Sequence, residues 1–281
     1  MKPIERKIGG FIMDIGKNLE KMFSLEGKTI ILTGASGGIG SELAKGLAAA
    51  GGHLILCGTS DQVLADLEAE IRAGGGKADA YHLDVTEFAS FPGFVDMLDK
   101  KYGKLDVLIN CAGVNKRIGF LDYDEETYDR IMNINLKGAF FLTQEVVKRM
   151  IPHKSGNIIN VSSHNAVGML GGCSVYGATK SGLTALTRSM AIEWAKHGIR
   201  ANAVAPGHIL TPLTTVTWEH PTRAQYLRER IAMQRPGTPE EVVGVVVMLA
   251  SDASSYMSGM MIHIDGGCLA GGTPWDYDTA Y

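Results

Sequence analysis

Short apolar stretches alternate along the chain with longer segments in which apolar residues recur at helical spacing. The short stretches are rich in Val, Ile and Leu on both faces, as in Thr29-Ile-Ile-Leu, which is typical of strands in a parallel sheet that helices cover on both sides. Strands are predicted near residues 28–33, 53–58, 78–83, 105–110, 156–162, 199–205 and 260–264. Helices are predicted near residues 39–50, 61–73, 87–102, 125–150, 175–197 and 239–250.

The strict alternation of strand and helix predicts an α/β fold with one doubly wound, Rossmann-type parallel sheet of about seven strands. The length of 281 residues alone would allow two domains. The alternation, however, runs from residue 28 to about residue 265 without a linker rich in Pro or Ser, so a second core has no place to begin. We therefore expect a single dinucleotide-binding and catalytic domain over residues 25–270, flanked by two shorter segments.

The N-terminal segment, residues 1–24, is predicted to be an amphipathic helical extension, because its apolar residues recur at helical spacing. Its net positive charge would suit a membrane surface. Gly9, Gly10 and Gly16 each weaken a free helix by roughly 1 kcal/mol, which favours docking on the protein body or on a neighbouring subunit instead. The C-terminal tail, residues 271–281, has aromatic residues without a period and is expected to be a loop that packs at a specific place.

Composition and charge argue against several classes of function. The net charge is −3 and the Lys and Arg residues are scattered, which disfavours nucleic-acid binding. The four cysteines lie far apart without a CxxC pair, so no metal site and no disulfide framework is predicted, and a cytoplasmic location is expected. The longest N-terminal apolar run is too short for a secretion signal or a membrane span. Glycine, with 35 residues, is over-represented, which indicates local backbone demands.

The segment after the first predicted strand, residues 33–40, reads TGASGGIG and opens a helix. Gly34, Gly38 and Gly40 would allow a sharp turn and the close approach of a pyrophosphate, while free N–H groups at the helix N-terminus face the anion. The spacing differs from the standard GxGxxG fingerprint, so a tight structural connection is the alternative. The position directly after the first strand favours a dinucleotide-binding turn.

The end of the second predicted strand reads Gly58-Thr59-Ser60-Asp61. An acidic side chain at this turn would bind the adenosine ribose of NAD, and an Arg would attract the 2′-phosphate of NADP. Gly58 and Thr59 do neither, and Asp61 is interpreted as the N-cap of the next helix. The cofactor is therefore NAD or NADP, with NAD slightly favoured because no basic residue stands here.

A phenol and an amine stand four residues apart, at Tyr176 and Lys180, on one face of a predicted helix. A neighbouring cation favours the phenolate, so the pKa of Tyr176 is expected to move toward the range useful for proton transfer. A surface lysine beside a half-buried tyrosine is the alternative. Ser163 ends a predicted strand at the carboxyl edge of the sheet, where ligands bind in such folds, and its hydroxyl could hold a substrate carbonyl oxygen.

Taken in order, these motifs resemble those of the short-chain dehydrogenase/reductase family. The resemblance covers about residues 26–268 and is carried by Thr33-Gly34-x3-Gly38-x-Gly40, Asn110-Cys-Ala-Gly113, Asn135, Ser163, Tyr176-x3-Lys180 and Pro206-Gly207. Each motif is weak alone, but their combination is highly specific. The resemblance implies an NAD(P)-dependent oxidoreductase that transfers a hydride between the cofactor and a secondary hydroxyl or ketone.

The resemblance also implies a role for each matching residue. Tyr176 would be the acid/base, and Ser163 would polarise the carbonyl. Lys180 would hold the nicotinamide ribose and lower the pKa of Tyr176, and Asn135 would anchor a water that relays protons. Asp84 would bind the adenine amino group, although taken alone it suggests a helix N-cap equally well. The implied cofactor contacts are Gly34, Ser36, Gly38, Ile39, Gly40, Thr59, Asp84, Val85, Asn110, Ala112, Gly113, Tyr176, Lys180, Pro206, Gly207, Ile209 and Thr211. A homo-oligomer, commonly a tetramer, is implied as well.

Polar and basic residues near the predicted site suggest a small polar substrate. Arg117 could clamp a carboxylate through two hydrogen bonds, although a solvated loop cation is equally compatible. The predicted substrate-binding residues are Arg117, Ser163, His164, Asn165, Tyr176 and His208. This region, with an expected lid over residues 211–223, resembles the sugar-acid branch of the family, such as gluconate 5-dehydrogenases and 2-deoxy-3-ketogluconate dehydrogenases. A polyol, sugar or sugar acid is therefore the leading substrate hypothesis.

Two other functions stay open. A 3-oxoacyl-carrier-protein reductase would need a basic docking patch for its acidic partner, for which Lys116 and Arg117 offer little support. A non-catalytic nucleotide-binding module is opposed by Ser163, Tyr176, Lys180 and Asn135. A pure binder has no use for a proton relay.

Overall fold

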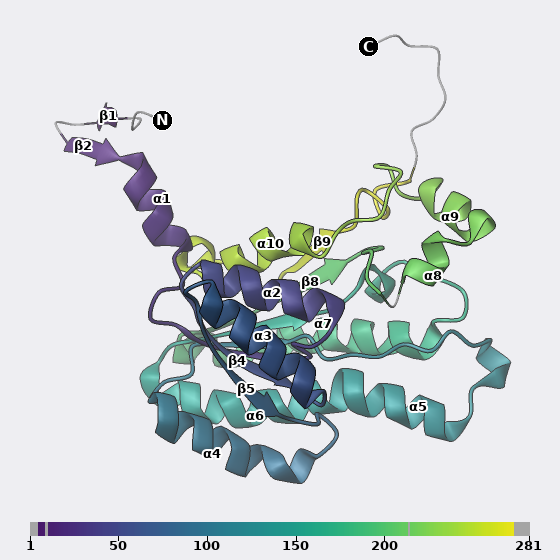
Figure 1. Ribbon diagram of the computed structural model, residues 1–281, viewed down its shortest axis with the longest axis horizontal. Helices are drawn as coiled ribbons and strands as arrows, with labels where there is room; N and C mark the ends of the chain where they lie inside the picture. The colour runs from purple at the N-terminus through teal and green to yellow at the C-terminus, as the bar shows by residue number, and fades with distance from the viewer. Residues whose placement is uncertain (1–4, 9–10, 213, 273–281) are drawn as a thin grey trace.

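The computed structural model describes residues 5–8, 11–212 and 214–272. Seven parallel strands form one sheet in the order β5-β4-β3-β6-β7-β8-β9 (Figure 1). They are β3 (Thr29–Thr33), β4 (His53–Gly58), β5 (Lys77–His82), β6 (Val107–Asn110), β7 (Gly156–Val161), β8 (Ile199–Pro206) and β9 (Met261–Ile264). The strands lie where the hydrophobic pattern predicts them, so the predicted doubly wound α/β fold is confirmed.

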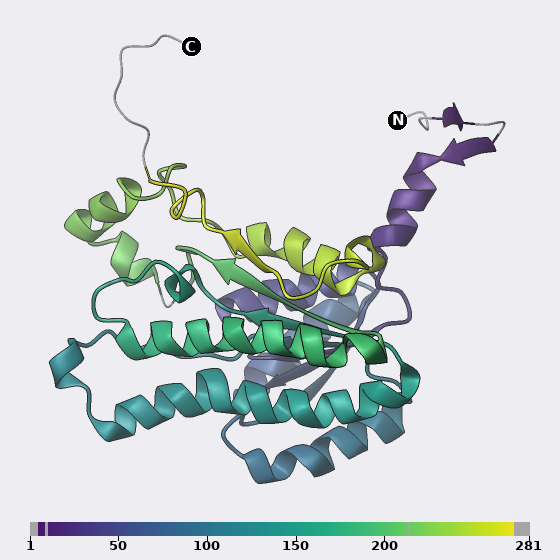
Figure 2. The same cartoon turned by 180° about the vertical axis from the view of Figure 1, so that it is seen from behind.

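Helices cover both faces of the sheet, because the central strands are apolar on both sides. The first layer consists of α2 (Gly38–Ala49), α3 (Asp61–Ala73) and α10 (Glu240–Ala250). The second layer, seen from behind in Figure 2, consists of α4 (Phe91–Tyr102), α6 (Gly138–Met150) and α7 (Ser174–Trp194). Strand β3 separates two apolar cores: Ile30 and Leu32 are buried in the first and Ile31 in the second.

The carboxyl ends of the strands lie side by side at one edge of the sheet. In the register of the sheet, Thr33 at the end of β3 pairs with Asn110 at the end of β6, and Asn110 pairs with Asn160 of β7. Strand β8 ends at Pro206, opposite Ile264 of β9. The loops that follow these strands therefore meet at this edge, which is where doubly wound sheets bind ligands.

Two predicted helices have a more detailed structure than the pattern shows. The helix predicted over 125–150 is α5 (Glu125–Met132) and α6, joined by a π-helical segment over Asn133–Lys137. The helix predicted over 87–102 starts with a 3-10 turn at Phe88–Ser90, and α4 begins only at Phe91. Apolar periodicity does not separate these helix types, since all three wind in the same sense with similar residues per turn.

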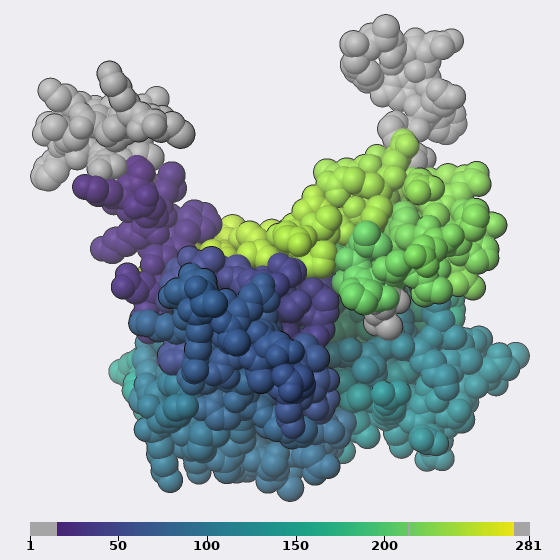
Figure 3. Space-filling model, viewed as in Figure 1, coloured from purple at the N-terminus to yellow at the C-terminus, as the bar shows by residue number. Residues whose placement is uncertain are grey.

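The expected lid over 211–223 overlaps two short helices that the pattern does not predict, α8 (Thr215–Trp218) and α9 (Pro221–Arg228), and the second extends beyond it. The start of α9 is fixed by Pro221 in its first turn and by His220, whose Nδ1 accepts a hydrogen bond from the N–H of Arg223 at 3.4 Å. In Figure 3 this segment, in green, stands over the teal part of the body.

The N-terminal extension is not one helix, so this prediction is wrong. Glu5–Ile8 (β1) and Phe11–Asp14 (β2) form an antiparallel pair, and only Ile15–Phe23 is helical (α1). In the sequence a Gly-Gly pair separates the two strands; such a pair is a poor helix former and a common hairpin connection. Helix α1 projects from the body in Figures 1 and 2, and Leu19 and Met22 are 50% and 44% exposed. Its apolar side chains are therefore not docked on the body, and docking on a neighbouring subunit stays a prediction.

The tail predicted over 271–281 lies outside the described residues from 273 onward. Within the described part of the chain, no helix combines the length and the apolar character that a membrane crossing requires.

Candidate active site

The glycine turn after β3 is a place where side chains have no room. Gly34 has a φ of +67°, and a Cβ atom on it would lie 2.8 Å from the Cα of Ala112. A Cβ atom on Gly40 would overlap the carbonyl oxygen of Gly34. The Thr33 hydroxyl accepts hydrogen bonds from the N–H groups of Cys111 (3.1 Å) and Ala112 (3.2 Å). This turn and the loop after β6 are thereby held together as one unit.

Helix α2 begins in this turn, and no side chain caps its first N–H groups. Gly37 occupies the N-cap position, so no side chain caps the helix. Free N–H groups at a helix N-terminus attract anions such as a pyrophosphate. Thr211 faces the same helix end, since a Cβ atom on Gly38 would lie 3.0 Å from the Cβ of Thr211. Ser36 lies in the turn beside Gly58, and Ile39 packs against the first core.

The turn after β4 differs from the prediction at Asp61. This residue is the first of α3, and the N-cap position belongs to Ser60. The Asp61 carboxylate instead contacts the Nδ1 atom of His82 at 2.7 Å, because the end of β5 brings the imidazole within reach. Thr59 is exposed at the same turn.

Asp84 does not cap a helix either. Its carboxylate accepts hydrogen bonds from the N–H group (2.8 Å) and the hydroxyl (2.7 Å) of Thr86, and so shapes the loop after β5. Val85 is buried against Gly138, where a Cβ atom would overlap the Val85 carbonyl oxygen. The loop after β5 is thereby tied to the start of α6.

Asn110 lies in a buried hydrogen-bonded row beneath the site. Its Nδ2 atom donates to Thr143 Oγ1 at 2.9 Å and to Asn160 Oδ1 at 2.8 Å. Asn160 in turn donates to Thr187 Oγ1 at 2.8 Å. These groups join β6 and β7 to the helices of the second layer. Connected buried polar groups of this kind make a fold rigid, so the row fixes the floor of the site.

Asn135 is buried in the π-helical segment, and its side chain is fully engaged. Its Oδ1 atom accepts from Val114 N–H and its Nδ2 atom donates to the Val114 carbonyl, both at 2.8 Å. A second, longer donation reaches Thr179 Oγ1 at 3.3 Å. π-helical turns recur at functional sites. Here the segment joins the loop after β6 to α7, and Gly113 in that loop faces both Asn135 and Lys180.

Lys180 is buried on α7, and the only hydrogen bond of its side chain among the described residues runs from Nζ to the carbonyl oxygen of Val161 at 2.8 Å. Burial lowers the pKa of Lys180 to about 8. The Nζ atom lies 5.6 Å from the centre of the Tyr176 ring. Its remaining donor capacity is therefore available to a ligand.

Tyr176 and Ser163 lie together, as their spacing predicts. Burial raises the pKa of Tyr176, and a hydrogen bond with Ser163 acts in the opposite direction. The expected lowering of the phenol pKa is therefore wrong for the cofactor-free protein, because loss of hydration outweighs the hydrogen bond with Ser163. Ser163 accepts a hydrogen bond from Asn165 N–H at 3.1 Å, so its own proton can be donated, to Tyr176 here or to the oxygen of a bound substrate.

Ser162 is a positioning residue that the sequence does not reveal. Its hydroxyl donates to the carbonyl oxygen of Lys180 at 3.0 Å and bonds Thr184 Oγ1 at 2.9 Å. These bonds fasten α7 to the end of β7. A serine at a strand end is common, and no spacing along the chain distinguishes it.

The loop after β8 carries the predicted residues Gly207, His208 and Ile209. Gly207 lies against β9, since a Cβ atom on it would be 2.7 Å from the Cα of Asp265. Ile209 is buried, and its carbonyl oxygen accepts from the Thr214 hydroxyl at 2.7 Å. The imidazole of His208 contacts that of His164, with ring centres 4.6 Å apart. Pro206 ends β8 just before this loop.

One of the predicted substrate residues, Arg117, lines a cavity under the α8–α9 segment. This cavity has a volume of about 480 Å³, and its lining consists of Arg117, Leu170, Gly171, Thr217, His220, Thr222, Arg223, Tyr226 and Leu227. Arg117 lies close enough to His208 to lower the pKa of that imidazole. His164 and Asn165 are buried beside Ser163 and not in the cavity lining. Arg223 is a candidate that the sequence does not single out.

The glycine turn, the buried lysine and the serine–tyrosine pair occur at one sheet edge in the order expected from the motifs. Residues 34–268 also match the family model described as enoyl-(acyl carrier protein) reductase. The chain belongs to the short-chain dehydrogenase/reductase family. It is therefore an oxidoreductase that acts on CH–OH groups with a nicotinamide cofactor, NAD or NADP.

Known members resemble this dehydrogenase over most of their length. It is 42% identical over 248 residues to the 3-oxoacyl-[acyl-carrier-protein] reductase FabG of Thermotoga maritima, which covers 87% of this chain and 99% of that protein. It is 32% identical over 251 residues to the 5-keto-D-gluconate 5-reductase of Escherichia coli, which covers 89% of this chain and 99% of that protein. A gluconate 5-dehydrogenase from Burkholderia cenocepacia, solved with NADP and tartrate, has a TM-score of 0.87 and 32% identity, and the match covers 90% and 99% of the two chains.

Proposed function

We propose that this dehydrogenase interconverts a secondary hydroxyl and a ketone on a sugar acid. The observation that carries the proposal is the cavity under α8–α9, whose lining includes Arg117 and Arg223. A guanidinium binds a carboxylate through two parallel hydrogen bonds. The hydroxyls of Thr217 and Thr222 and the imidazole of His220 supply further polar groups for a substrate with several hydroxyls.

Two imidazoles connect Arg117 in the cavity lining to the neighbourhood of the reacting groups. Arg117 acts electrostatically on His208, His208 contacts His164, and His164 follows Ser163 directly. A carboxylate at Arg117 would thus leave the rest of a sugar-acid chain pointing toward Ser163 and Tyr176. His164, Asn165 and His208 would contact its hydroxyls.

The residues at the sheet edge fit a nicotinamide dinucleotide. The uncapped N-terminus of α2 offers N–H groups to a pyrophosphate, and the Nζ atom of Lys180 has donors left for ribose hydroxyls. Glycine at position 38 leaves the first residue of α2 without a side chain, so the backbone there could approach a pyrophosphate closely. When bound, the cofactor supplies or accepts the hydride.

The chain's own residues handle the proton. Because burial raises its pKa, Tyr176 keeps its proton at neutral pH and can give it to the oxygen of a ketone. Ser163 donates a hydrogen bond to the same oxygen. In the direction of alcohol oxidation Tyr176 must lose its proton, and the Lys180 ammonium stabilises the phenolate. Asn135 holds the loop after β6 in place behind Lys180.

We further propose a preference for NAD. The turn after β4 carries no basic side chain, and the Asp61 carboxylate at its end would repel a 2′-phosphate. The related gluconate 5-dehydrogenase of B. cenocepacia was solved with NADP, so the preference rests on this turn alone. Comparing kcat/KM for the two cofactors tests it, and equal or better use of NADP would contradict it.

The substrate proposal is tested by steady-state rates on a matched panel. We expect keto-sugar acids such as 5-keto-D-gluconate to be reduced with at least about tenfold higher kcat/KM than neutral ketoses of the same length, because only the acids engage Arg117 and Arg223. Equal rates on both would remove the role of the carboxylate.

A second candidate, 3-oxoacyl-carrier-protein reductase, is favoured by the 42% identity to the T. maritima enzyme. An acetoacetyl thioester belongs in the same panel. Activity on the thioester alone would reverse the order of the two proposals. Binding of the cofactor without turnover of any alcohol or ketone would favour a non-catalytic module.

A homotetramer remains a prediction from the family, and a cytoplasmic location remains a prediction from the cysteine pattern. Light scattering on the purified chain would measure the assembly, and removal of residues 1–24 would show whether α1 contributes to it.

A further inference from the structure

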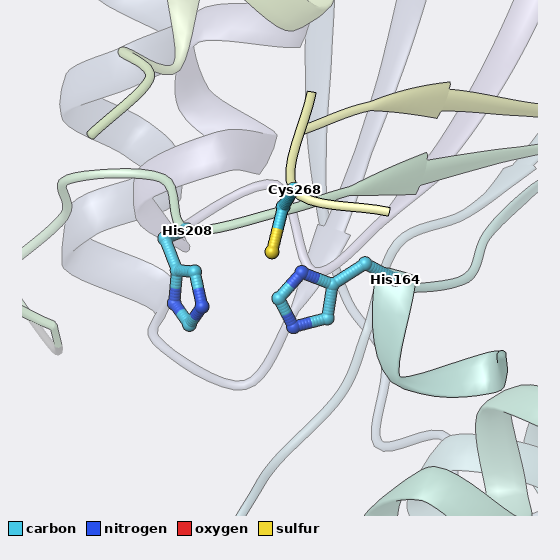
Figure 4. A group of neighbouring side chains, drawn as sticks. All are labelled: His164, His208 and Cys268. Atoms are coloured by element: carbon cyan, nitrogen blue, oxygen red, sulfur yellow. The ribbon is translucent and has the colours of Figure 1, made fainter. Parts of the chain in front are cut away.

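Three side chains with metal-binding atoms meet beside the catalytic residues. His164 follows β7, His208 follows β8 and Cys268 follows β9, and Figure 4 shows the three side chains converging from these separate loops. Each contributes one ligand atom, an imidazole nitrogen or Sγ, and these atoms all lie within 4.8 Å of one another. Among the described residues this is the group of His, Cys, Asp and Glu whose ligand atoms come close enough to hold an ion.

The spacing is close to that of a zinc site. Bonds of about 2.0–2.3 Å in a tetrahedron place nitrogen and sulfur ligands roughly 3.3–3.6 Å apart. Side-chain rotations that move the ligand atoms by about an ångström would therefore close the group around an ion. Two imidazoles and one thiolate are ligands that zinc and similar borderline metals prefer over calcium or magnesium.

An unpartnered buried atom points to a missing ligand. His164 is only 5% exposed, and its Nδ1 atom is buried without a hydrogen-bond partner in the described structure. Buried polar atoms without partners are uncommon, and each calls for an explanation such as an ion. In Figure 4 one ring nitrogen of His164 faces the sulfur of Cys268.

The charge state of the imidazoles also suits a metal. Burial lowers the pKa of His164, and burial together with His164 and Arg117 lowers the pKa of His208 to about 3. Both rings are therefore neutral at pH 7, the form that binds metals. The Asp265 carboxylate attracts a cation at both rings, whereas Arg117 opposes it at His208.

The loop that carries Cys268 has a fixed conformation beside His208. Asp265 accepts hydrogen bonds from the N–H groups of Gly267 and Leu269, both at 3.0 Å, and so fixes the turn around Cys268. Gly266 and Gly267 have φ of +63° and +82°, a conformation that other residues rarely adopt. The backbone around Cys268 is therefore held in a defined conformation.

We propose that His164, His208 and Cys268 bind a zinc-type divalent cation, leaving a fourth position for water. Binding displaces the thiol proton of Cys268 to solvent. Since His164 adjoins Ser163, the ion would occupy space that the proposed sugar acid needs. Zinc is then an inhibitor that competes with the substrate.

Cobalt(II) titration of the purified full chain tests the site without any substrate, so its result does not depend on the proposed function. We expect one cobalt per chain, with the visible spectrum of tetrahedral cobalt, a thiolate-to-cobalt charge-transfer band and displacement by zinc. The Cys268→Ser variant is expected to lose the charge-transfer band and at least about tenfold in affinity, and His208→Gln to lose a similar factor.

Two variants serve as matched controls. Cys57→Ala removes a thiol buried in β4, and His153→Gln removes an exposed imidazole at the opposite edge of the sheet. Both should retain the band and the affinity, and circular dichroism should show all variants folded. Unchanged cobalt binding in Cys268→Ser and His208→Gln, or a spectrum of octahedral cobalt in the parent chain, would overturn the proposal.

Inhibition kinetics provide an independent measurement. The zinc inhibition constant of each variant is compared with that variant's own zinc-free rate. A weakening of at least about tenfold is expected in Cys268→Ser and none in Cys57→Ala. Inhibition that extra substrate does not relieve would contradict the placement of the ion in the substrate space.

Discussion

The Nζ atom of Lys180 donates a 2.8 Å hydrogen bond to the carbonyl oxygen of Val161, and no carboxylate of the described residues pairs with this ammonium. The fold therefore carries a buried cation that only a ligand can satisfy further. A buried charge without an ionic partner lowers the stability of the fold, and at a ligand site this loss accompanies function.

Replacement of Lys180 by Met should stabilise the cofactor-free protein at neutral pH and abolish turnover. Because the pKa of Lys180 falls from 10.5 to about 8 on folding, the buried charge costs stability below pH 8. Above pH 8 the folded protein has lost a proton that the unfolded chain still binds, so this cost shrinks. The advantage of Lys180→Met over the parent chain should thus fall by about 2 kcal/mol between pH 7 and pH 9.5.

Urea denaturation at the two pH values measures this difference. The exposed Lys196→Met variant controls for the loss of one lysine. An advantage that does not change with pH would show that the amine is not buried as a cation.

Replacement of Tyr176 by Phe should leave cofactor affinity nearly unchanged and lower kcat by about 10²–10⁴-fold, since the phenolic proton is removed and the ring is kept. Nicotinamide fluorescence titration and steady-state kinetics give the two values. Near-normal turnover would remove Tyr176 from its proposed role.

Replacement of Gly34 by Ala should weaken both stability and cofactor binding. The new Cβ would meet the backbone of Ala112 at 2.8 Å in a residue with φ of +67°. Gly27 is the matched control, because its φ of +77° is similar but nothing lies within 4 Å of its Cβ position. We expect Gly27→Ala to cost about 1 kcal/mol and Gly34→Ala clearly more, with a cofactor Kd raised at least about tenfold. Equal losses in both would mean that the contact with Ala112 is unimportant.

Replacement of Asn110 by Ala should destabilise the fold by roughly 2–3 kcal/mol, because it leaves the buried Oδ1 atom of Asn160 without its donor. Denaturant unfolding measures the loss. The Asn115→Ala variant, at an exposed position in the loop after β6, should cost less than about 1 kcal/mol. Similar values for the two would argue against the buried row as a support of the site.

Replacement of Arg117 by Gln should raise KM for a sugar acid by about 10–100-fold and leave a neutral polyol unaffected, since one charge-assisted interaction is lost. The ratio of kcat/KM values for the two substrates is the measurement. Lys116→Gln is the neighbouring control, because Lys116 already bonds Thr127 Oγ1 at 3.2 Å. An equal decrease of kcat/KM on both substrates would mean that Arg117 supports the structure of the site and does not bind the carboxylate.

The strands could be predicted because burial on both faces leaves a plain signal, as at Ile30 and Ile31. The meeting of Ser163, Tyr176 and Lys180 could be predicted as well, because one of these residues follows a strand and the other two lie on one face of the next helix. The extension could not be predicted, because spacing at residues 1–24 fits a helix while the Gly-Gly pair favours a hairpin. Helical period also concealed the π-helical segment around Asn135.

Contacts between distant loops were out of reach of the sequence. Cys268 approaches His164 and His208 only because three strands end at the same edge, and no spacing motif connects them. The pKa of Tyr176 depends on how completely α7 and its neighbours exclude water, which a sequence does not state. Arg223 reaches the cavity only through the fold of the α8–α9 segment.

Strand β3 is apolar on both faces, so sliding it by one residue would exchange its two sides at little hydrophobic cost. Its alignment must be set by polar groups at its ends. At one end Thr29 N–H donates to Asp106 at 2.9 Å, and at the other the Thr33 hydroxyl accepts from the loop after β6. The Thr33 side chain, which shapes the dinucleotide turn, therefore also helps to set the register of β3. Loss of the Thr33 hydroxyl would allow misaligned pairing of β3 in the sheet and would also weaken cofactor binding.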